Sequence, residues 1–506
     1  MYYKNKVLSL WLVASSLVFS SVIQGCSQKK NELTWDKSYS NIGSQSSIRT
    51  EDINQDGVLD IIMGAGENEH QHSEQGILAF DGKTGNILWQ QESDNQMFGT
   101  ATLYDINGDG VRDIFIGGRG PQFKALDGKT GGIIWAYNYA FENDSILKYA
   151  KFNFYNCALI PDQTNDGLSD LLVLNGGNAK AGPNSRIGRV PGVLMIMDSK
   201  TGDIIAADTM PDGEESYMSP LCFAQPGSEE YQIIFGSGGE TLPGSMYIAS
   251  LADLREGKLS NAHKLVSETG HGFIAPPVLV DITGDGQYEL VAISHASTIS
   301  AIDLKGEKVL WQQKIPNTES SNSFAVGYFT EDDIPDFFTF VSKGEWPNNT
   351  GSLQIMLDGK DGRIAYIDSM GCTGFSSPVV YDINQDGIDD ALISINEFDC
   401  NREFDDKTPL NIVNKLVNID FKTKKVNAID QLPGFKNIFT TPWIGDLDND
   451  GYLDIVYCQY YNPSTYLLAF LGMRIKRISS NLKMKNAPLW GGYMGSEGDG
   501  VFHSSH

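Results

Sequence analysis

Short apolar runs of strand length recur along the whole chain, and each follows a turn rich in Asp, Asn and Gly. Examples are DIIMG from Asp60, DIFIGG from Asp113 and DIVYC from Asp454. Apolar and polar positions alternate in neighbouring segments, which is typical of β-strands because successive side chains of a strand point to opposite faces. No repeat contains a long stretch of helical periodicity. The pattern therefore predicts an all-β fold.

The turns before these runs are copies of one motif. DINQDG occurs at 52–57 and again, letter for letter, at 382–387. Related loops are DINGDGVRD at 105–113, DQTNDGLSD at 162–170, DITGDGQYE at 281–289 and DLDNDGYLD at 446–454, and two degenerate copies are located by their flanks. Repeats begin near residues 52, 105, 162, 224, 281, 328, 382 and 446, or about every 56 residues. That spacing is typical of one propeller blade per repeat.

A second motif lies downstream of the loop in six of the repeats. It reads AFDGKTG at 79–85, followed by Trp89, and ALDGKTGGIIW at 125–135, with weaker copies at 197–205, 301–311, 356–364 and 418–426. Asp-Gly and Thr-Gly supply the positive φ angles of a tight hairpin. Each repeat then holds two hairpins, so the sequence predicts an eight-bladed β-propeller with four antiparallel strands per blade. We expect Trp35 to lie in an outer strand that completes the last blade, whereas the tail after Phe470 contains no recognisable hairpin.

The two motifs resemble those of known propellers over about residues 40 to 470. The Asp-rich loop resembles the FG-GAP or VCBS repeat of integrin-like propellers. The second motif resembles the blade motif of quinoprotein dehydrogenases and of the lipoprotein in the outer-membrane barrel assembly machinery. The quinoprotein resemblance implies that neighbouring blades dock through Asp81, Gly85 and Trp89, and through Asp127, Gly131 and Trp135. Such motifs specify a blade and not an activity.

The Asp-rich loops have the ligand spacing of a Ca²⁺ site. Ca²⁺ takes about six to eight oxygen ligands, and a turn can offer side chains at positions 1, 3, 5 and 9 and a main-chain carbonyl at position 7. Position 1 is Asp52, Asp105, Asp162, Asp281, Asp382 or Asp446, and position 3 is Asn54, Asn107, Thr164, Thr283, Asn384 or Asp448. Position 5 is Asp56, Asp109, Asp166, Asp285, Asp386 or Asp450, and position 9 is Asp60, Asp113, Asp170, Glu289, Asp390 or Asp454.

We therefore expect about six structural Ca²⁺ ions, with none around Ala224 and Tyr328. An EF-hand is excluded because position 12 holds Met63 or Ile116 in the first two loops, where a bidentate Glu is required. The six loops contain 19 acidic ligands, and six Ca²⁺ ions would change the formal charge from -26 to -14. Metal-free Asx-rich turns are the alternative.

The N-terminus predicts export and lipidation. Lys4 and Lys6 precede an apolar run from 7 to 22, which ends shortly before Gly25 and Cys26. This arrangement resembles a bacterial lipoprotein signal, with 1–25 as signal peptide, Cys26 as the lipidated residue, 26–32 as a tether and 33–506 as a single propeller. An uncleaved membrane anchor is the alternative. Both place the protein in the cell envelope, outside the cytoplasm and attached to a membrane, at the outer membrane or cell surface or facing the periplasm.

Net charge limits the class of partner, and the cysteine positions predict one disulfide. The formal charge of -26 argues against a nucleic acid partner, which needs a basic surface. Cys372 and Cys400 lie fourteen residues on either side of Asp386, so an unbroken hairpin register would place them opposite each other as a disulfide. The remaining cysteines are expected to be buried thiols; they are Cys157, Cys222 and Cys458.

Function is expected on the face opposite the Ca²⁺ loops, where the variable connections gather. These are 64–77, 136–155, 175–192, 343–351 and 395–413. On that face His271 and His295 enter and leave the same blade and form the best pair for a catalytic or metal site, although two unrelated histidines remain the alternative. The favoured function is a protein- or glycan-binding scaffold. The alternatives are a calcium-dependent polysaccharide lyase of the eight-bladed rhamnogalacturonan type and, less favoured, a quinoprotein dehydrogenase.

Overall fold

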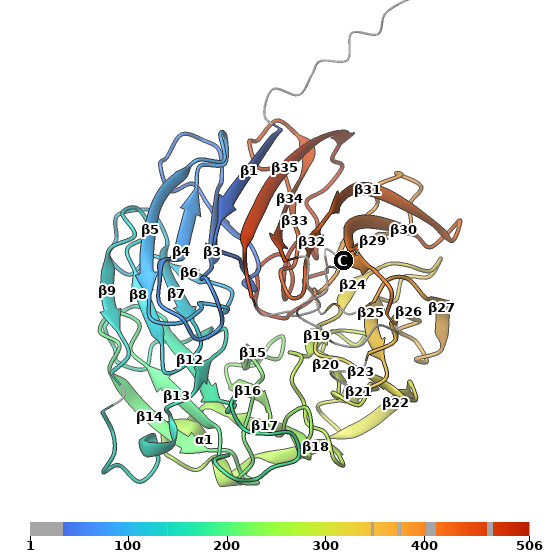
Figure 1. Cartoon of the computed structure of the whole chain (residues 1–506). Helices are drawn as coiled ribbons and strands as arrows, with labels where there is room; N and C mark the ends of the chain where they lie inside the picture. The colour runs from blue at the N-terminus through green and yellow to red at the C-terminus, as the bar shows by residue number, and fades with distance from the viewer. Residues whose placement is uncertain are drawn as a thin grey trace, which may run out of the picture. The chain divides into compact units, whose positions relative to one another are not determined.

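The computed structural model describes residues 34–138, 140–345, 349–372, 374, 376–400, 411–462 and 469–504. Leu33–His506 forms one compact unit. Within it, eight antiparallel sheets are arranged in a ring, and the colours of Figure 1 run once around it from blue to red. The predicted eight-bladed β-propeller with four strands per blade is therefore confirmed. The signal peptide 1–25, the tether 26–32 and the lipidation site Cys26 lie outside the described residues.

Seven blades have their four strands in sequence order, from the inner to the outer strand, and the eighth takes its outer strand, β1, from the other end of the chain. The inner strands are β2 (Arg49–Glu51), β6 (Thr102–Tyr104), β11 (Ala158–Ile160), β15 (Leu221–Ala224), β19 (Val278–Val280), β24 (Ala325–Gly327), β28 (Val379–Tyr381) and β33 (Trp443–Gly445). The second strands are β3 (Asp60–Gly64), β7 (Asp113–Gly117), β12 (Asp170–Gly176), β16 (Tyr231–Gly236), β20 (Glu289–Ile293), β25 (Asp336–Lys343), β29 (Asp390–Glu397) and β34 (Tyr452–Tyr461).

The outer half of each blade is the second hairpin. Third strands are β4 (Ser73–Phe80), β8 (Phe123–Leu126), β13 (Val193–Met197), β17 (Gly244–Ser250), β21 (Thr298–Asp303), β26 (Gly351–Leu357), β30 (Val413–Asp420) and β35 (Gly472–Lys483). Outer strands are β5 (Ile87–Ser93), β9 (Ile133–Ala136), β14 (Ile204–Thr209), β18 (His263–Glu268), β22 (Lys308–Lys314), β27 (Ile364–Asp368), β31 (Lys425–Pro433) and β1 (Trp35–Ser40). The two hairpin motifs of the sequence therefore correspond to the inner and outer halves of a blade.

A few short elements supplement the blades. Short strands β10 (Asn153–Phe154), β23 (Thr318–Glu319) and β32 (Phe435–Lys436) pair with the second strands of their blades. The described helices are α1 (Leu251–Arg255), η1 (Leu147–Tyr149) and η2 (Leu259–Asn261). None of them is long and apolar enough to cross a membrane.

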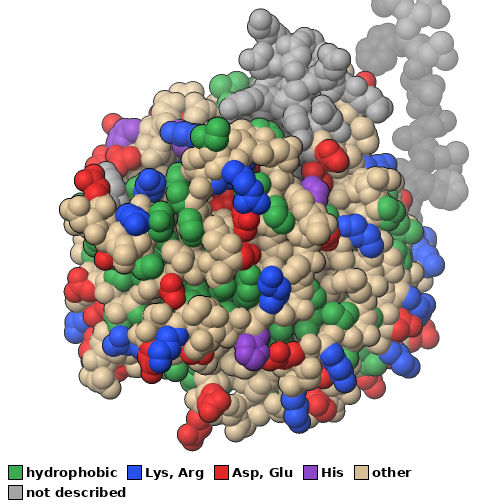
Figure 2. Space-filling view, turned by 90° about the horizontal axis from the view of Figure 1, so that it is seen from below, with side chains coloured by type: hydrophobic (Ala, Val, Ile, Leu, Met, Phe, Trp, Pro, Cys, Tyr) green, Lys and Arg blue, Asp and Glu red, His purple; other side chains and the backbone are tan. Residues whose placement is uncertain are grey.

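Burial follows the position of a strand within its blade. Second strands such as β3 and β7 are buried at every residue, because neighbouring blades cover both of their faces. Outer strands such as β5 alternate between half-buried and exposed residues, because only one face packs on the next blade. Figure 2 shows one side of the ring, where acidic and basic side chains are interspersed. The core thus lies between the blades and not within a single sheet.

The N-terminal strand closes the ring, as predicted. β1 pairs antiparallel with β35 over six residue pairs, from Trp35 opposite Arg477 to Ser40 opposite Gly472. The last blade therefore takes its outer strand from the beginning of the chain (Figure 1). This pairing joins the two ends of the propeller through main-chain hydrogen bonds.

Outer-strand tryptophans dock four of the blades on the next one, which confirms the structural role that the quinoprotein resemblance implies; they are Trp35, Trp89, Trp135 and Trp311. The Trp89 indole N–H donates to the Gly128 carbonyl of the next blade at 3.0 Å, and the Trp89 ring covers Gly131. A Cβ at Gly131 would lie 2.5 Å from that ring, and the residue has a φ of +72°. Glycine is therefore required there both for space and for backbone conformation. Trp35 docks in the same way on Gly82 of the first blade.

The C-terminal tail, whose place the sequence did not predict, packs against the inner strands of several blades. Trp490 is 1% exposed, and its carbonyl accepts a hydrogen bond from Val380 N–H in the seventh blade. Leu279 of the fifth blade forms a bridge with Val501, and Ile444 N–H of the eighth blade donates to Gly491. The tail thus connects inner strands that lie on different sides of the ring.

The predicted disulfide between Cys372 and Cys400 is present. The register extends beyond β28 and β29, since Cys372 N–H donates to the Asn396 carbonyl at 2.7 Å. The other described cysteines are free thiols: Cys157 and Cys458 are buried as expected, whereas Cys222 is only partly buried. Burial raises the pKa of the Cys222 thiol to about 12.

Candidate functional site

The inner strands run from one face of the propeller to the other, and this separates the two sets of loops. The Asp-rich loops connect the inner strands to the second strands on one face. The connections that enter each blade, and those between second and third strands, lie on the opposite face. The sequence predicted this division, because it follows from the strand order.

The Asp-rich loops are folded around their own carboxylates. In the first loop, the Asp52 carboxylate accepts hydrogen bonds from the N–H groups of Asp56 and Gly57, each at 3.0 Å. Asp56 Oδ1 accepts from Val58 N–H at 3.0 Å. The loop at 382–387 repeats this arrangement with Asp382 and Asp386. The position-1 and position-5 carboxylates therefore both cap main-chain N–H groups of their own turn.

The carboxylate at position 9 has a structural role that could not be predicted from its spacing in the loop. Asp60 is 0% exposed; one carboxylate oxygen accepts from Ile53 and Asn54 N–H, and the other accepts from Gly82 N–H at 2.9 Å. It thereby joins the inner loop to the outer hairpin turn. Burial raises the pKa of Asp60 to about 6 and, in the seventh blade, that of Asp390 to about 7.

The degenerate sixth repeat has a buried carboxylate in the same role. Asp336 occupies the same place, and its carboxylate accepts hydrogen bonds from the N–H groups of Phe329, Thr330 and Gly359. Position 1 of that loop is Tyr328, although position 3 is Thr330 and position 5 is Asp332. The buried carboxylate at position 9 therefore keeps its hydrogen bonds in a loop that lacks the position-1 carboxylate.

The last loop gathers three carboxylates and an arginine. One oxygen each of Asp446, Asp448 and Asp450 lies within 4.8 Å of the others. Arg477, which is 0% exposed, donates to Asp448 at 2.7 Å and to Asp454 at 2.8 Å. Within the described residues, the buried Oδ1 of Asp448 has no hydrogen-bond partner. That oxygen is an available ligand for a cation in this acidic cluster.

Two loops, at 162–170 and 281–289, have threonine at position 3, and in both the hydroxyl donates to a carboxylate of the same loop. Thr164 Oγ1 donates to Asp162 at 3.3 Å, and Thr283 Oγ1 donates to Glu289 at 3.3 Å. These hydroxyls interact with other predicted ligands of the same loop. Their loops are therefore the weaker candidates for a cation.

The opposite face holds a pocket of about 320 Å³ on the propeller axis. All eight blades contribute to its wall, mostly through residues just before the inner strands: Ser47, Thr100, Asn156, Ser219, Ile274, Ser321, Ser377 and Phe439. Aromatic side chains add to it, namely Phe98, Tyr155, Tyr217 and, from the C-terminal tail, Tyr493. The tail therefore contributes to the lining of a pocket that the sequence did not predict.

Small hydroxyl residues form hydrogen bonds between neighbouring blades at the wall of this pocket. Ser46 Oγ of the first blade donates to the Gly99 carbonyl of the second at 2.8 Å. Ser376 Oγ of the seventh blade donates to Thr440 of the eighth, and Thr441 N–H donates to Ser47 Oγ at 3.0 Å. The Ser and Thr residues that precede several inner strands thus connect neighbouring blades around the axis.

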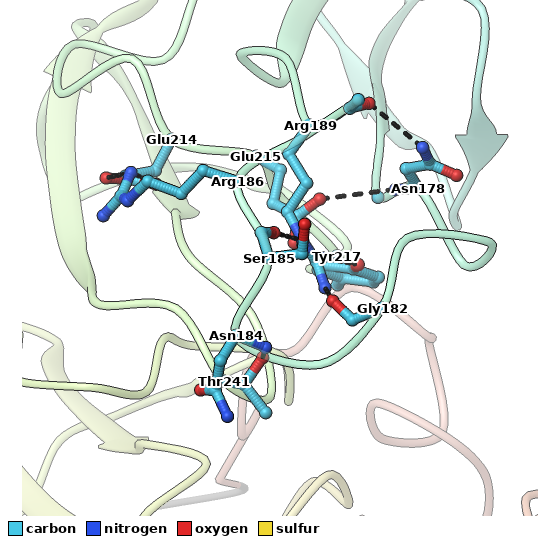
Figure 3. A network of polar contacts seen from close by, with 12 residues as sticks. Asn178, Gly182, Asn184, Ser185, Arg186, Arg189, Glu214, Glu215, Tyr217 and Thr241 are labelled. Atoms are coloured by element: carbon cyan, nitrogen blue, oxygen red, sulfur yellow. Dashed lines mark hydrogen bonds and ion pairs between the residues drawn. The ribbon is translucent and has the colours of Figure 1, made fainter.

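The loop at 177–192 forms one rim of the pocket and is held by Arg189 (Figure 3). Arg189 donates to the carbonyls of Ser185 and Gly182 within its own loop, and to Tyr217 Oη at 3.0 Å. It also forms a buried ion pair with Glu215. Arg189 therefore fixes the loop against the entrance of the fourth blade.

His271 and His295 come together at another part of the rim, as predicted. Their ring centroids are 5.7 Å apart. Glu319, which the sequence analysis did not identify, joins them: the three residues each offer one ligand atom, and these atoms lie within 4.8 Å of one another. Glu319 enters from the next blade on β23, and no motif surrounds it, so only the fold reveals it.

Comparisons with known proteins define the fold but not a family. No protein-family model matches the chain, and no curated protein sequence matches it significantly. A europium-containing methanol dehydrogenase aligns with a TM-score of 0.54 and 12% identity, over 88% of this chain and 92% of that one. Quinohemoprotein alcohol dehydrogenase from Comamonas testosteroni aligns with a TM-score of 0.51 and 11% identity, over 90% and 77%.

BamB from Moraxella catarrhalis also aligns, with a TM-score of 0.47 and 12% identity, over 88% of this chain and all of that one. At such identities, the two dehydrogenases establish a shared propeller fold and nothing about activity. The predicted similarity to quinoprotein blades is therefore confirmed for the fold. The resemblance to FG-GAP or VCBS calcium repeats stays a prediction.

Proposed function

We propose that this protein is a lipid-anchored envelope protein whose propeller binds a glycan in its central pocket. The pocket carries this proposal because its size and lining suit a small, hydroxyl-rich ligand. Ligand pockets of about 300 to 1,000 Å³ that combine aromatic faces with a few convergent polar groups are typical binding sites. A protein partner would instead need about 800 Å² of its own surface in the interface.

Two polar side chains of the pocket, Arg119 and Gln45, are suited to ligand recognition. Arg119 lies over the Phe98 ring at 4.5 Å and pairs with Glu69 at 2.8 Å, so its charge is compensated before any ligand arrives. Gln45 lines the pocket and is 4% exposed, and among the described residues its Nε2 has no hydrogen-bond partner. A sugar hydroxyl is a suitable acceptor for this amide.

In this proposal the Asp-rich loops bind structural Ca²⁺ on the opposite face. The donor set supports it: acidic side chains at positions 1 and 5 of six loops, with a buried free oxygen of Asp448 in the last one. Cys26 attaches the propeller to a membrane through its lipid. The ions stabilise the scaffold and leave the pocket face to the ligand.

Isothermal titration calorimetry on residues 33–506 tests the binding role, with pectin-type and neutral oligosaccharides in buffer containing Ca²⁺. We expect saturable binding that Phe98→Ala weakens at least tenfold, because this half-buried ring lines the pocket. Tyr231→Ala is the matched control, since this exposed tyrosine begins β16 near the opposite face. Equal loss of affinity in both variants, or no binding by the wild type, would contradict the proposal.

A further inference from the structure

We infer that His271, His295 and Glu319 form a binding site for one divalent transition-metal ion of the Zn²⁺ type. Two imidazole nitrogens and one carboxylate oxygen are a known zinc ligand set, which leaves a fourth coordination position open. Their ligand atoms lie within 4.8 Å of one another. Ligands around a tetrahedral zinc ion are about 3.3 Å apart, so small side-chain movements complete the geometry.

The hydrogen bonds of the two rings leave the metal-binding nitrogens free. His295 Nδ1 lies 3.0 Å from the Ser320 carbonyl, and His271 Nδ1 lies 2.6 Å from the Glu240 carbonyl. A carbonyl oxygen only accepts, so each Nδ1 carries the proton and each Nε2 has the lone pair. Metal-binding histidines almost always show this arrangement, because the second hydrogen bond orients the ring.

His295 Nε2 independently points to a ligand. The residue is 2% exposed, and within the described residues this nitrogen has no hydrogen-bond partner. Glu319 is 7% exposed, and its Oε2 lies 3.7 Å from His295 Nε2, beyond hydrogen-bonding distance. A buried lone pair without a partner is costly, and a cation between these groups would remove that cost.

The backbone holds the three residues in place. His295 N–H donates to the Gly272 carbonyl at 2.8 Å, next to His271. Ser320 N–H, next to Glu319, donates to the His295 carbonyl at 2.9 Å. The three ligands therefore lie on segments that are hydrogen-bonded directly to one another, which lowers the cost of ordering them around an ion.

The proposed ion lies beside the central pocket, since His295, Ser321 and Glu240 also line that pocket. Its open position could therefore bind a water molecule or an oxygen atom of a ligand in the pocket. The inference goes beyond the glycan-binding role, because the ion binds without any glycan. Failure of one proposal leaves the other intact.

The test uses residues 33–506 freed of metal with a chelator and then held in excess Ca²⁺, so that the Asp-rich loops do not take up the probe. Calorimetry with Zn²⁺ should give one tight site per chain. Co²⁺ should give visible absorption bands typical of nitrogen ligands in a low-coordinate site. Absence of a stoichiometric Zn²⁺ site in the wild type would overturn the inference.

Two variants locate the site. His271→Ala and Glu319→Gln should each weaken Zn²⁺ binding roughly 100-fold and abolish the Co²⁺ bands. His271 is the safer ligand to replace because it is only partly buried. His263→Ala is the matched control, because the exposed His263 pairs with Glu307 at 2.6 Å on the outer strand β18. Undiminished Zn²⁺ affinity in folded His271→Ala, or equal loss in His263→Ala, would place the ion elsewhere.

Discussion

Arg477 and Asp448 form an ion pair of 2.7 Å inside the last blade, where Arg477 is 0% exposed. The arginine comes from β35, the third strand, whereas the aspartate belongs to the Asp-rich loop. The same guanidinium also binds Asp454 and the Gly82 carbonyl of the first blade. Asp448, the fourth acidic residue of this loop, is thus paired with the positive charge of Arg477 at the junction between the last and first blades.

Replacing this arginine should be strongly destabilising. Arg477→Met leaves two buried carboxylates without their cation, and breaking a buried pair in this way costs about 3–5 kcal/mol. Arg474→Met is the control, because Arg474 pairs with Asp36 on the more exposed side of the same strand, where a pair contributes about 1 kcal/mol or less. Urea unfolding measures both. Similar midpoints for the two variants would contradict a stabilising role for the buried pair.

Removal of Ca²⁺ should lower the melting temperature. Clustered carboxylates repel one another unless a cation neutralises them, and an ion that binds only the folded state stabilises it by mass action. Differential scanning calorimetry in excess chelator and in excess Ca²⁺ measures the difference. An unchanged melting curve would count against structural Ca²⁺.

Ca²⁺ stoichiometry should fall by one when a single loop is altered. Asp56→Ala removes the carboxylate at position 5 of the first loop, where the Asp56 main-chain N–H donates to the Asp52 carboxylate. Asp333→Ala changes an exposed acid in the degenerate sixth loop and should leave the number of ions unchanged. Equilibrium dialysis with elemental analysis gives both numbers. Equal Ca²⁺ content in all three proteins would show that the first loop binds no ion.

The docking of blades can be tested at adjacent glycines. Gly131→Ala places a Cβ 2.5 Å from the Trp89 ring at a φ of +72°, so we expect a loss of at least about 1–2 kcal/mol from the backbone alone. Gly132→Ala is the control, because this residue is exposed and the only neighbour of its Cβ is the Thr130 side chain at 3.3 Å. Thermal unfolding compares them. A tolerated Gly131→Ala would mean that the blades can separate at this turn.

Loss of the disulfide should destabilise the seventh blade. Cys372 and Cys400 are 28 residues apart, and a cross-link closing a loop of that length contributes about 3 kcal/mol through the unfolded chain. Cys372→Ser with Cys400→Ser removes it, and Cys222→Ser controls for serine at a free thiol. We expect only the double variant to unfold at lower urea concentration. A midpoint equal to that of the wild type would indicate that the loop is ordered without the bond.

The tail should contribute to the stability of the whole ring. Trp490→Ala empties a fully buried site between blades, for which about 3–5 kcal/mol is expected. Trp490→Phe should cost much less, because the indole N–H has no hydrogen-bond partner among the described residues. Urea unfolding followed by circular dichroism measures both. If alanine is tolerated as well as phenylalanine, the tail does not hold the blades together.

The repeats by themselves determined the number of blades, the two hairpins in each and the completion of the last blade by the strand at Trp35. The blade number and the hairpins depend on residues close together in sequence, such as Asp-Gly turns and the strands on either side of them, so the pattern contains the information. The completion of the last blade joins distant residues, and it was predicted because the strand at Trp35 has no blade of its own. The Cys372–Cys400 bond belongs to the same class, because both cysteines flank one loop. Positions 1 and 5 of the Asp loops were also recognisable from their spacing.

Only the tertiary structure decided which residues of different blades meet. Glu319 joins His271 and His295 from the next blade, Arg477 reaches the loop of its own blade and the turn of the first, and Tyr493 reaches the axis from the tail. These contacts connect segments with no shared motif, so no periodicity encodes them. The hydrogen bonds of the position-9 carboxylates could not be predicted for the same reason. Their second partner belongs to another hairpin, as Gly82 does for Asp60, and only the folded blade brings the two together.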